Sequence, residues 1–168
     1  MSGARPDPGA RPDPGARPSA GTSTAANAMS EAEVSAFLAE LQEARLATVR
    51  ADGDIHLTPV WYLALPDGRI HVFLESRRLH LANLRRRPRA ALLVDRDERP
   101  RGGTEARAAV LRCAVELVED EAAVDMARHA LIRRYRGPDA PLPRTPDFRY
   151  VLCVLTPERV TAWDFAKG

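Results

Sequence analysis

Apolar side chains recur at helical spacing ahead of the first strand-like segment of the chain. They are Val34, Phe37, Leu38 and Leu41. A repeat of three or four residues places them on one face of an α-helix. Ser30 and Glu33 stand three residues apart before this run, which is the pattern of a capping box. The spacing therefore predicts an amphipathic helix over residues 31–44.

The hydrophobic period then changes to the alternation typical of β-strands. Three strands are predicted, at residues 45–50, 55–64 and 69–75. Asp52-Gly53 and Pro66-Asp67-Gly68 separate them and are strong turn signals, so the strands form an antiparallel meander. Pro59 has no backbone donor, which predicts a bulge or an open edge within the second strand.

Further elements follow the meander. The pattern predicts helices at 77–87 and 119–136 and strands at 90–94, 106–118, 150–155 and 159–164, the last two joined by a bend at Thr156-Pro157. Pro88 ends the first of these helices and Gly137 caps the second. The inner face of the second is predicted to carry Val124, Ala127, Leu131 and Tyr135. About six mostly antiparallel strands and three helices predict a mostly β fold that closes into a barrel.

Residues 1–28 differ in composition from the rest of the chain. GARPDP begins at Gly3 and again at Gly9, and GARPSA follows from Gly15. Proline removes backbone donors, glycine adds chain entropy, and there is almost nothing apolar to bury. We therefore expect a disordered tail over residues 1–28 and one folded domain over residues 29–168.

Composition places the folded part among globular domains. Of the 168 residues, 45% are hydrophobic and 29% charged. The 25 basic and 23 acidic residues nearly balance, which argues against nucleic acid or a membrane surface as a partner. Cys113 and Cys153 lie in separate apolar runs and are expected to be buried thiols in a reducing cytosol. A cytoplasmic location is expected, because no run resembles a membrane span or a signal peptide.

Catalytic machinery that works without a cofactor is not expected. The chain has no GxSxG elbow, HExxH motif or P-loop. Its histidines, at positions 56, 71, 80 and 129, fall in three kinds of element and share no metal-ligand spacing, so no metal site is expected.

The strongest candidate site is an anion pocket at the end of the third strand. Ser76, Arg77 and Arg78 stand at the predicted start of the next helix. A helix N-terminus offers free N–H groups, and guanidinium groups add charge-assisted bonds, so these residues are suited to a phosphate. Ser76 would cap the helix or donate to the anion. The alternative is a solvated helix start whose arginines bind nothing.

Five short motifs occur in order along the chain. They are Arg45-Leu46-Ala47-Thr48-Val49, Asp52-Gly53, Thr58-Pro59-Val60-Trp61-Tyr62, Asp67-Gly68 and Asn83-Leu84-Arg85-Arg86-Arg87-Pro88-Arg89. Their order and spacing resemble the pyridoxamine 5′-phosphate oxidase-like split β-barrel superfamily, and most closely its small actinobacterial branch of flavin- or F420-dependent oxidoreductases. The resemblance covers residues 30–164. It implies a homodimer of six-stranded split β-barrels, with two cofactors in clefts between the subunits.

The resemblance also implies which residues hold the cofactor. The second strand borders the ring, the end of the third strand and the start of the next helix hold the phosphate, and Trp163 lines the cleft of the partner subunit. The residues so assigned are Thr58, Pro59, Val60, Trp61, Glu75, Ser76, Arg77, Arg78, His80, Asn83 and Trp163. No catalytic residue is assigned.

One position departs from the family pattern. Many relatives carry a basic pair or a lysine eight or nine residues before the proline that ends this helix, where this chain has His80 and Leu79. Either the helix start is shifted and Arg77 and Arg78 bind the phosphate, or His80 takes the place of the lysine.

The implied function is that of an oxidoreductase whose flavin-type cofactor, F420 or FMN, transfers hydride to a small planar substrate. The alternative is a non-catalytic flavin- or haem-binding protein of the same fold. F420 has a longer acidic tail than FMN. Arg85, Arg86, Arg87 and Arg89 could form a basic groove for that tail or be plain surface charge, so both cofactors stay open. Loops at 96–104 and 138–146 would shape the substrate pocket.

Overall fold

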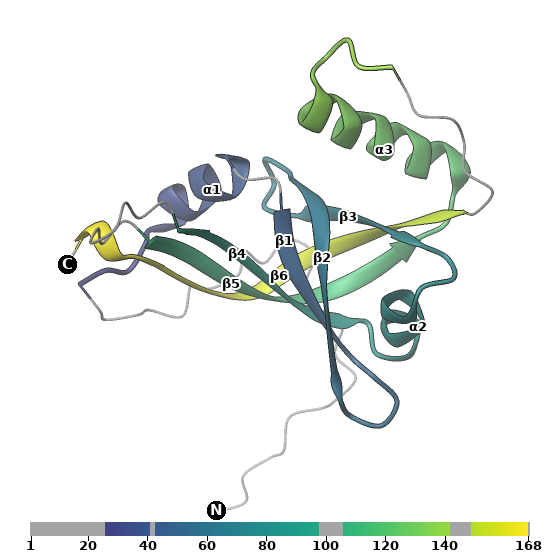
Figure 1. Ribbon diagram of the computed structural model, residues 1–168, viewed down its shortest axis with the longest axis horizontal. Coiled ribbons are helices and arrows are strands. Elements are labelled where there is room, and N and C mark those ends of the chain that lie inside the picture. The colour runs from purple at the N-terminus through teal and green to yellow at the C-terminus, as the bar shows by residue number, and fades with distance from the viewer. Residues whose placement is uncertain (1–25, 41–42, 98–105, 142–148, 168) are drawn as a thin grey trace, which may run out of the picture.

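The computed structural model describes residues 26–40, 43–97, 106–141 and 149–167 (Figure 1). The elements are α1 (Glu31–Glu40), β1 (Glu43–Val49), β2 (Ile55–Ala64), β3 (Ile70–Glu75), α2 (Leu79–Arg86), β4 (Arg89–Asp97), β5 (Ala106–Val118), α3 (Glu121–Arg136), β6 (Tyr150–Asp164) and a 3₁₀ turn (Phe165–Lys167). Most of the predicted tail, and most of both loops expected to shape the substrate pocket, lie outside the described residues. Among the described helices, none is long and apolar enough to cross a bilayer.

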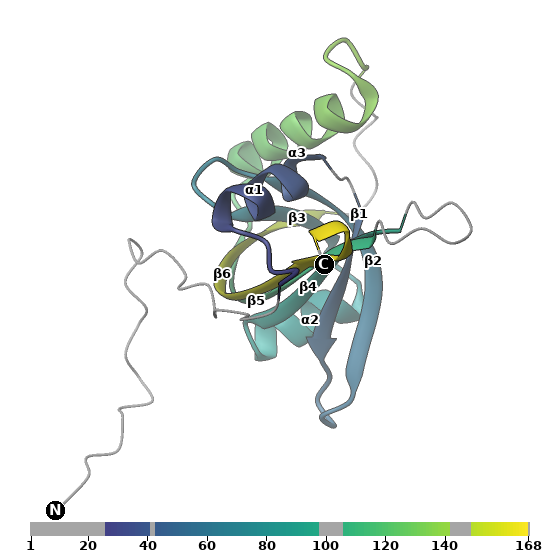
Figure 2. The same cartoon turned by 90° about the vertical axis from the view of Figure 1, so that its left-hand side faces the viewer.

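The six strands form one closed antiparallel barrel in the order β1-β2-β3-β6-β5-β4. The pairing of β1 with β4, from Arg45 opposite Leu93 to Ala47 opposite Ala91, completes the ring. Figure 2 shows β5 and β6 curving around the barrel, with α1 and the C-terminal turn at the near end. The predicted mostly β fold, with six antiparallel strands and three helices, is confirmed for the described part of the chain.

Local sequence signals set several boundaries. In the capping box, the Ser30 N–H donates to a Glu33 carboxylate oxygen at 2.7 Å, and the Glu33 N–H donates to Ser30 Oγ at 3.4 Å. Glu33 also accepts from Lys167 Nζ at 2.6 Å. This bond, followed by the two hydrogen bonds from Ser30, lowers the pKa of the Glu33 carboxyl to about 2. Gly53 and Gly68 have φ values of 94° and 84°, the left-handed conformation that both predicted Asp-Gly turns require.

β2 changes partner part-way along its length. Residues 55–61 pair with β1 alone, and pairing with β3 is confined to residues 62–64. Pro59 lies in the first stretch, so its missing N–H interrupts no second ladder. The predicted open edge at Pro59 is confirmed, and the barrel is split where β2 leaves β3.

The end of the barrel is one long strand rather than two. β6 runs without a break from Tyr150 to Asp164. Its register against β5 shifts between Arg112, which faces Arg159, and Cys113, which faces Pro157, so Glu158 is left over as an extra residue. The bend predicted at Thr156-Pro157 is thus absorbed by a bulge, because the ladder on both sides keeps the strand continuous.

Two other predicted boundaries were wrong because pairing with distant residues moved them. The first helix was predicted to continue to residue 44, but Glu43 and Ala44 already pair with Trp61 and Val60 as the start of β1. Residues 27–29, partly assigned to the tail, bond to the last strand: the Asp164 N–H donates to the Asn27 carbonyl at 2.8 Å.

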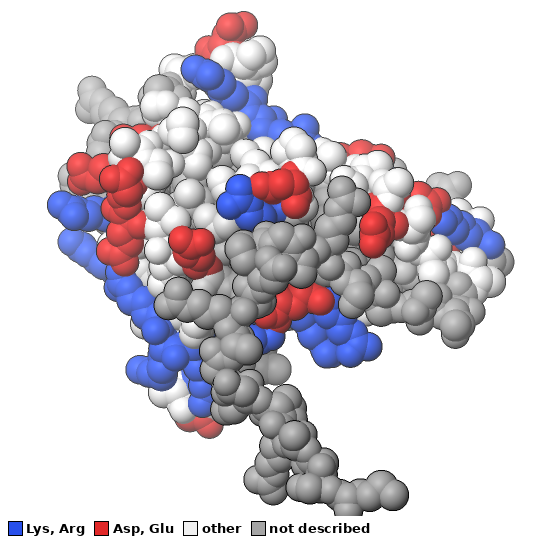
Figure 3. Space-filling view, turned by 180° about the vertical axis from the view of Figure 1, so that it is seen from behind, with Lys and Arg blue, Asp and Glu red and all other residues white. Residues whose placement is uncertain are grey.

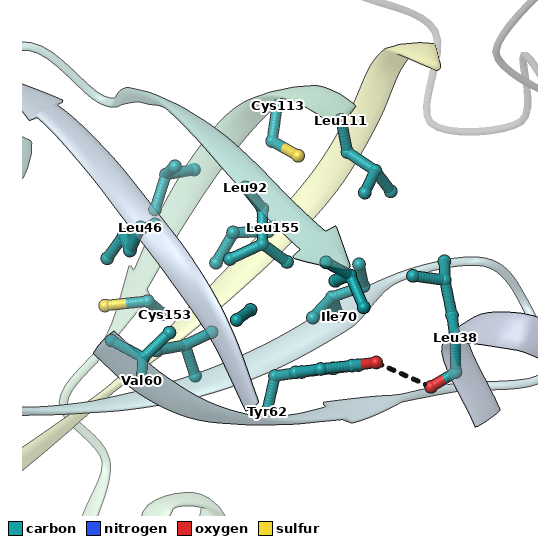
Figure 4. Packing of buried hydrophobic residues seen from close by; sticks show 14 of the residues in the cluster. Leu38, Leu46, Val60, Tyr62, Ile70, Leu92, Leu111, Cys113, Cys153 and Leu155 are labelled. Atoms are coloured by element: carbon teal, nitrogen blue, oxygen red, sulfur yellow. Dashed lines mark hydrogen bonds between the residues drawn. The ribbon is translucent and has the colours of Figure 1, made fainter. Parts of the chain in front are cut away.

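The barrel interior holds the main core (Figure 4). Its largest fully buried side chains include Tyr62, Phe37, Leu46, Ile70, Leu92 and Leu155. Tyr62 Oη donates to the Leu38 carbonyl at 2.8 Å and so ties the end of α1 to the barrel. Cys113 and Cys153 are buried free thiols, as predicted. Burial raises the pKa of both to about 12, so both stay protonated and unreactive.

Candidate functional site

α3 stands beside the barrel (Figure 1), and side chains from both of its halves contact the barrel. Asp120 caps its N-terminus by accepting from the Ala123 N–H at 2.9 Å, and Gly137 ends it with a φ of 97°. The predicted end at Gly137 is therefore confirmed, whereas the helix starts at Glu121, two residues later than the predicted residue 119, because Asp120 is its N-cap. In its first half, Val124 and Ala127 pack against Leu152 and Val154 of β6. The second half of α3 lies against β2, where Tyr135 contacts Trp61 and Tyr62.

Tyr135 joins that second half to β2. Its ring stacks on Trp61, with centroids 4.4 Å apart and planes inclined by 20°. Its hydroxyl accepts from the Tyr62 N–H at 3.0 Å and donates to the Tyr62 carbonyl at 3.2 Å. Burial raises the pKa of Tyr135 to about 12, so the hydroxyl keeps the proton that it donates. The Tyr135 side chain thereby satisfies the N–H and the carbonyl of Tyr62, at the point where the pairing partner of β2 changes from β1 to β3.

A cleft of about 720 Å³ lies between α3 and the barrel. Its lining residues are Glu43, Pro59, Val60, Trp61, Phe73, Leu74, Glu75, Arg78, His80, Arg128, Leu131, Ile132, Arg136 and Tyr150. The barrel wall comes from β2, β3 and the start of α2, and the opposite wall from α3. A volume of this size matches a site for a cofactor or a drug-sized ligand, for which about 300–1,000 Å³ is usual.

The structure brings six of the predicted site residues into this cleft. They are Pro59, Val60, Trp61, Glu75, Arg78 and His80. Thr58, Ser76, Arg77, Asn83 and Trp163 are not among its lining residues. Asn83 is instead fully buried and donates to Thr48 Oγ1 at 3.0 Å, which ties α2 to β1. Trp163 lies near the C-terminal end of β6, where it pairs with Ala108 of β5 and with Ala28.

The start of α2 differs from the prediction. The helix begins at Leu79 rather than at residue 77, and Arg78 occupies the N-cap position without a side-chain cap. Ser76 therefore does not cap the helix; its N–H donates to the Arg149 carbonyl at 2.9 Å. The turn at residues 76–78 separates the two arginines, since Arg78 lines the cleft whereas Arg77 is exposed outside it.

Arg78 and His80 present two different groups to the cleft. The Arg78 guanidinium donates to Glu75 at 2.6 Å, which lowers the pKa of the Glu75 carboxyl. His80 Nε2 is buried and has no hydrogen-bond partner among the described residues. Burial, followed by the charge interactions with His56 and Arg78, lowers the pKa of His80, so the ring is neutral at pH 7. A buried ring nitrogen without a partner indicates a missing ligand or solvent contact.

The α3 wall was not part of the predicted site. Arg128, Leu131, Ile132 and Arg136 line the cleft from this helix. Helical periodicity correctly placed Val124, Ala127 and Leu131 on its buried side, but could not say what that side faces. Periodicity also carried no signal that Arg128 and Arg136 would reach the same cleft as Trp61.

The arginines that follow Asn83 lie outside the cleft lining. Arg85 pairs with Glu119 at 2.7 Å, and Arg89 is bonded to Glu158. Arg86 and Arg87 are exposed. Figure 3 shows a run of basic groups along this edge of the molecule, with acidic groups near it. Of the two interpretations offered by the sequence, surface charge describes these four residues.

These features define a split β-barrel protein with a cleft at the open edge of β2. The sequence profile described as pyridoxamine 5′-phosphate oxidase matches residues 30–164. The chain therefore belongs to the pyridoxamine 5′-phosphate oxidase family. Comparison with curated protein sequences finds no match.

Solved structures share the fold. The conserved hypothetical protein Rv2991 from Mycobacterium tuberculosis has a TM-score of 0.72 at 28% identity, over 85% of this chain and 89% of that one. A protein named F420 reductase has a TM-score of 0.59 at 24% identity, over 74% of this chain and 93% of that one. The FAD binding protein from Mycobacterium smegmatis has a TM-score of 0.60 at 16% identity, over 82% and 97%. The last two comparisons support the fold alone.

The attachment of α3 can be tested by replacing Tyr135 with phenylalanine. The ring that stacks on Trp61 remains, but the Tyr62 N–H and carbonyl lose their partner. We expect the free energy of unfolding, measured by urea denaturation, to fall by about 1–3 kcal/mol. The affinity for a ligand in the cleft should fall too, because the α3 wall loosens. The comparison variant Tyr62→Phe loses the buried bond to Leu38 and should be destabilised without weaker ligand binding; equal ligand affinities in both variants would contradict this role of Tyr135.

Proposed function

We propose that this protein is an oxidoreductase that binds a phosphorylated flavin-type cofactor, FMN or F420, in the α3 cleft and transfers hydride to a small planar substrate. The observation that carries the proposal is the meeting of an aromatic surface and anion-binding groups in one cleft. Trp61 supplies the first, and Arg78 with His80 the second. Membership of the pyridoxamine 5′-phosphate oxidase family supports it.

The residues present fit a phosphate at the start of α2. The backbone N–H groups of Leu79 and His80 belong to the first helical turn and have no acceptor within the described residues. His80 Nε2 can donate to a phosphate oxygen and so gain the partner it lacks. Arg78 adds a charge-assisted bond by sharing its guanidinium between Glu75 and the ligand. Of the two alternatives left open by the sequence, this proposal combines Arg78 with His80 and leaves Arg77 out.

The chain's own contribution is binding, orientation and shielding from water. A bound flavin or deazaflavin supplies the hydride chemistry. Pro59, Val60 and Trp61 would hold its ring on the barrel side, while Leu131 and Ile132 cover the cleft from α3. No side chain is assigned to proton transfer. A cytoplasmic location, expected from the sequence, completes this proposal.

The protein is further proposed to act as a homodimer. The outward side of β2 is apolar and open: Ile55 is 71% exposed, Leu57 61% and Trp61 44%. Single exposed apolar residues are ordinary, but these alternate along one strand face and form a stripe. The stripe extends onto the neighbouring strand β1, since Val49 lies opposite Ile55 and Ala47 opposite Leu57. In this proposed dimer, Trp163 of the second copy would line the cleft, as the family resemblance implies.

Titration of the cofactor-free full-length protein with FMN and, separately, with F420 tests the proposal. Binding of one or both should be seen as a change in cofactor fluorescence, followed by turnover with a reductant. Micromolar or weaker binding of both would overturn the proposal. A protein that binds FMN tightly but stays inert to every reductant would instead be a non-catalytic flavin-binding member of the fold.

A further inference from the structure

α3 adds a second pair of basic side chains to the cleft. Arg128 and Arg136 line it from the α3 wall, across from β2 and β3. They are eight positions apart in the helix, which at 1.5 Å per residue is about 12 Å along its axis. The cleft therefore carries positive charge well beyond the start of α2, where a single phosphate would lie.

The three arginines that line the cleft differ in how far their charge is already paired with other side chains of the protein. Arg78 is paired with Glu75 at 2.6 Å. The Arg128 side chain is only 12% exposed, lies over the Tyr150 ring at 5.4 Å from its centroid, and approaches Asp125 at 3.9 Å. Arg136 is exposed and forms no ion pair with any residue in the described ranges. Its charge is thus the most available for a ligand.

Position and surroundings hold Arg136 at the rim of the cleft. It follows Tyr135, whose stacking on Trp61 and bonds to Tyr62 fix this turn of α3 against β2. Glu43 also lines the cleft, but its carboxylate is not within ion-pair distance of Arg136. A guanidinium in this setting suits a carboxylate or phosphate, which it can bind through two parallel N–H bonds.

We propose that the α3 wall forms a second anion subsite, in which Arg136, assisted by Arg128, binds a carboxylate or phosphate group of the molecule in the cleft. This inference rests on the proposed function. The anion has two sources, the acidic tail of a deazaflavin cofactor or a charged substituent on the planar substrate. With this subsite, the cleft binds anionic groups both at the start of α2 and at the α3 wall, and the ring of the ligand lies between them.

The test compares ligands that differ only in this anion. Wild-type protein and Arg136→Gln are titrated with F420 carrying its glutamate tail and with the same phosphorylated deazaflavin lacking the glutamates. The protein loaded with its cofactor is then titrated with benzoate and with benzamide. Arg133→Gln is the matched control, because Arg133 is an exposed arginine in the same last turn of α3 and does not line the cleft.

We expect Arg136→Gln to weaken binding of the member of one pair that carries the extra carboxylate by about tenfold, and to leave the binding of the member without it unchanged. Loss confined to tailed F420 assigns the anion to the cofactor, and loss confined to benzoate assigns it to the substrate. Equal loss for both members, no loss for either pair, or the same loss in Arg133→Gln would overturn the subsite. Failure of the wild type to bind any deazaflavin or FMN would overturn the proposed function itself, and is distinct from these outcomes.

Discussion

Replacing Arg78 by alanine is expected to weaken the binding of FMN or F420 by about tenfold or more, whereas replacing the adjacent Arg77 should have little effect. The two arginines are neighbours in the sequence, carry the same charge and are both exposed. They differ in place: Arg78 lines the cleft, and Arg77 does not. The pair therefore separates a specific phosphate contact from the general attraction of positive charge.

The loss at Arg78 has two physical parts. The phosphate loses a charge-assisted bond. Glu75, whose carboxylate accepts from Arg78 at 2.6 Å, loses its counter-charge and then repels the phosphate. Fluorescence titration at fixed ionic strength measures both variants against the wild type. Equal weakening in Arg77→Ala and Arg78→Ala would show that nearby positive charge is sufficient, and unchanged affinity in Arg78→Ala would move the phosphate site elsewhere.

Replacing Leu57 by aspartate is expected to convert the proposed dimer into a monomer. Leu57 is 61% exposed at the middle of the apolar stripe on β2. A second copy covering this stripe would have to bury the new carboxylate in an apolar contact without a partner, which is strongly unfavourable. The variant should keep its fold, because Leu57 faces away from the barrel interior, where Val60 and Tyr62 are buried.

The measurement is molar mass by light scattering after size exclusion. Wild type is expected at twice the mass of the chain, and Leu57→Asp at the mass of one chain, with weaker cofactor binding because the partner's contribution to the cleft is lost. Met126→Asp is the matched control, since Met126 is an apolar side chain on α3 that is 72% exposed and lies outside the stripe. A wild-type monomer, or a Leu57→Asp dimer, would contradict this interface.

Much of the fold could be predicted because its signals are local. The capping box joins residues three apart, and the Asp-Gly turns need only the conformational freedom of Gly53 and Gly68. The bounds of β2 and β5 match the predicted residues 55–64 and 106–118. In each case the groups that decide the structure lie within a few residues of one another, so the pattern of the chain contains them.

The candidate site was only partly predictable for the opposite reason. The distance in sequence from Pro88 left two alternatives for the phosphate site. Either the helix start is shifted and Arg77 and Arg78 bind the phosphate, or His80 takes the place of the family's lysine. The structure starts α2 at Leu79 and brings Arg78 and His80 together in the cleft. The resemblance assigned Asn83 to the cofactor, but its side-chain amide donates a hydrogen bond to Thr48, which lies 35 residues earlier in the chain.

By itself, then, the sequence determined most of the strands, the Asp-Gly turns, the capping box at Ser30 and the mostly β architecture, because hydrophobic period, capping and glycine conformation act over short stretches of chain. Tertiary structure alone decided that α3 lies across from β2. That arrangement depends on Tyr135 reaching the backbone of Tyr62, 73 residues away, and on the packing of Val124 against β6. Contacts between distant segments leave no period in the sequence, and here they make the second wall of the cleft.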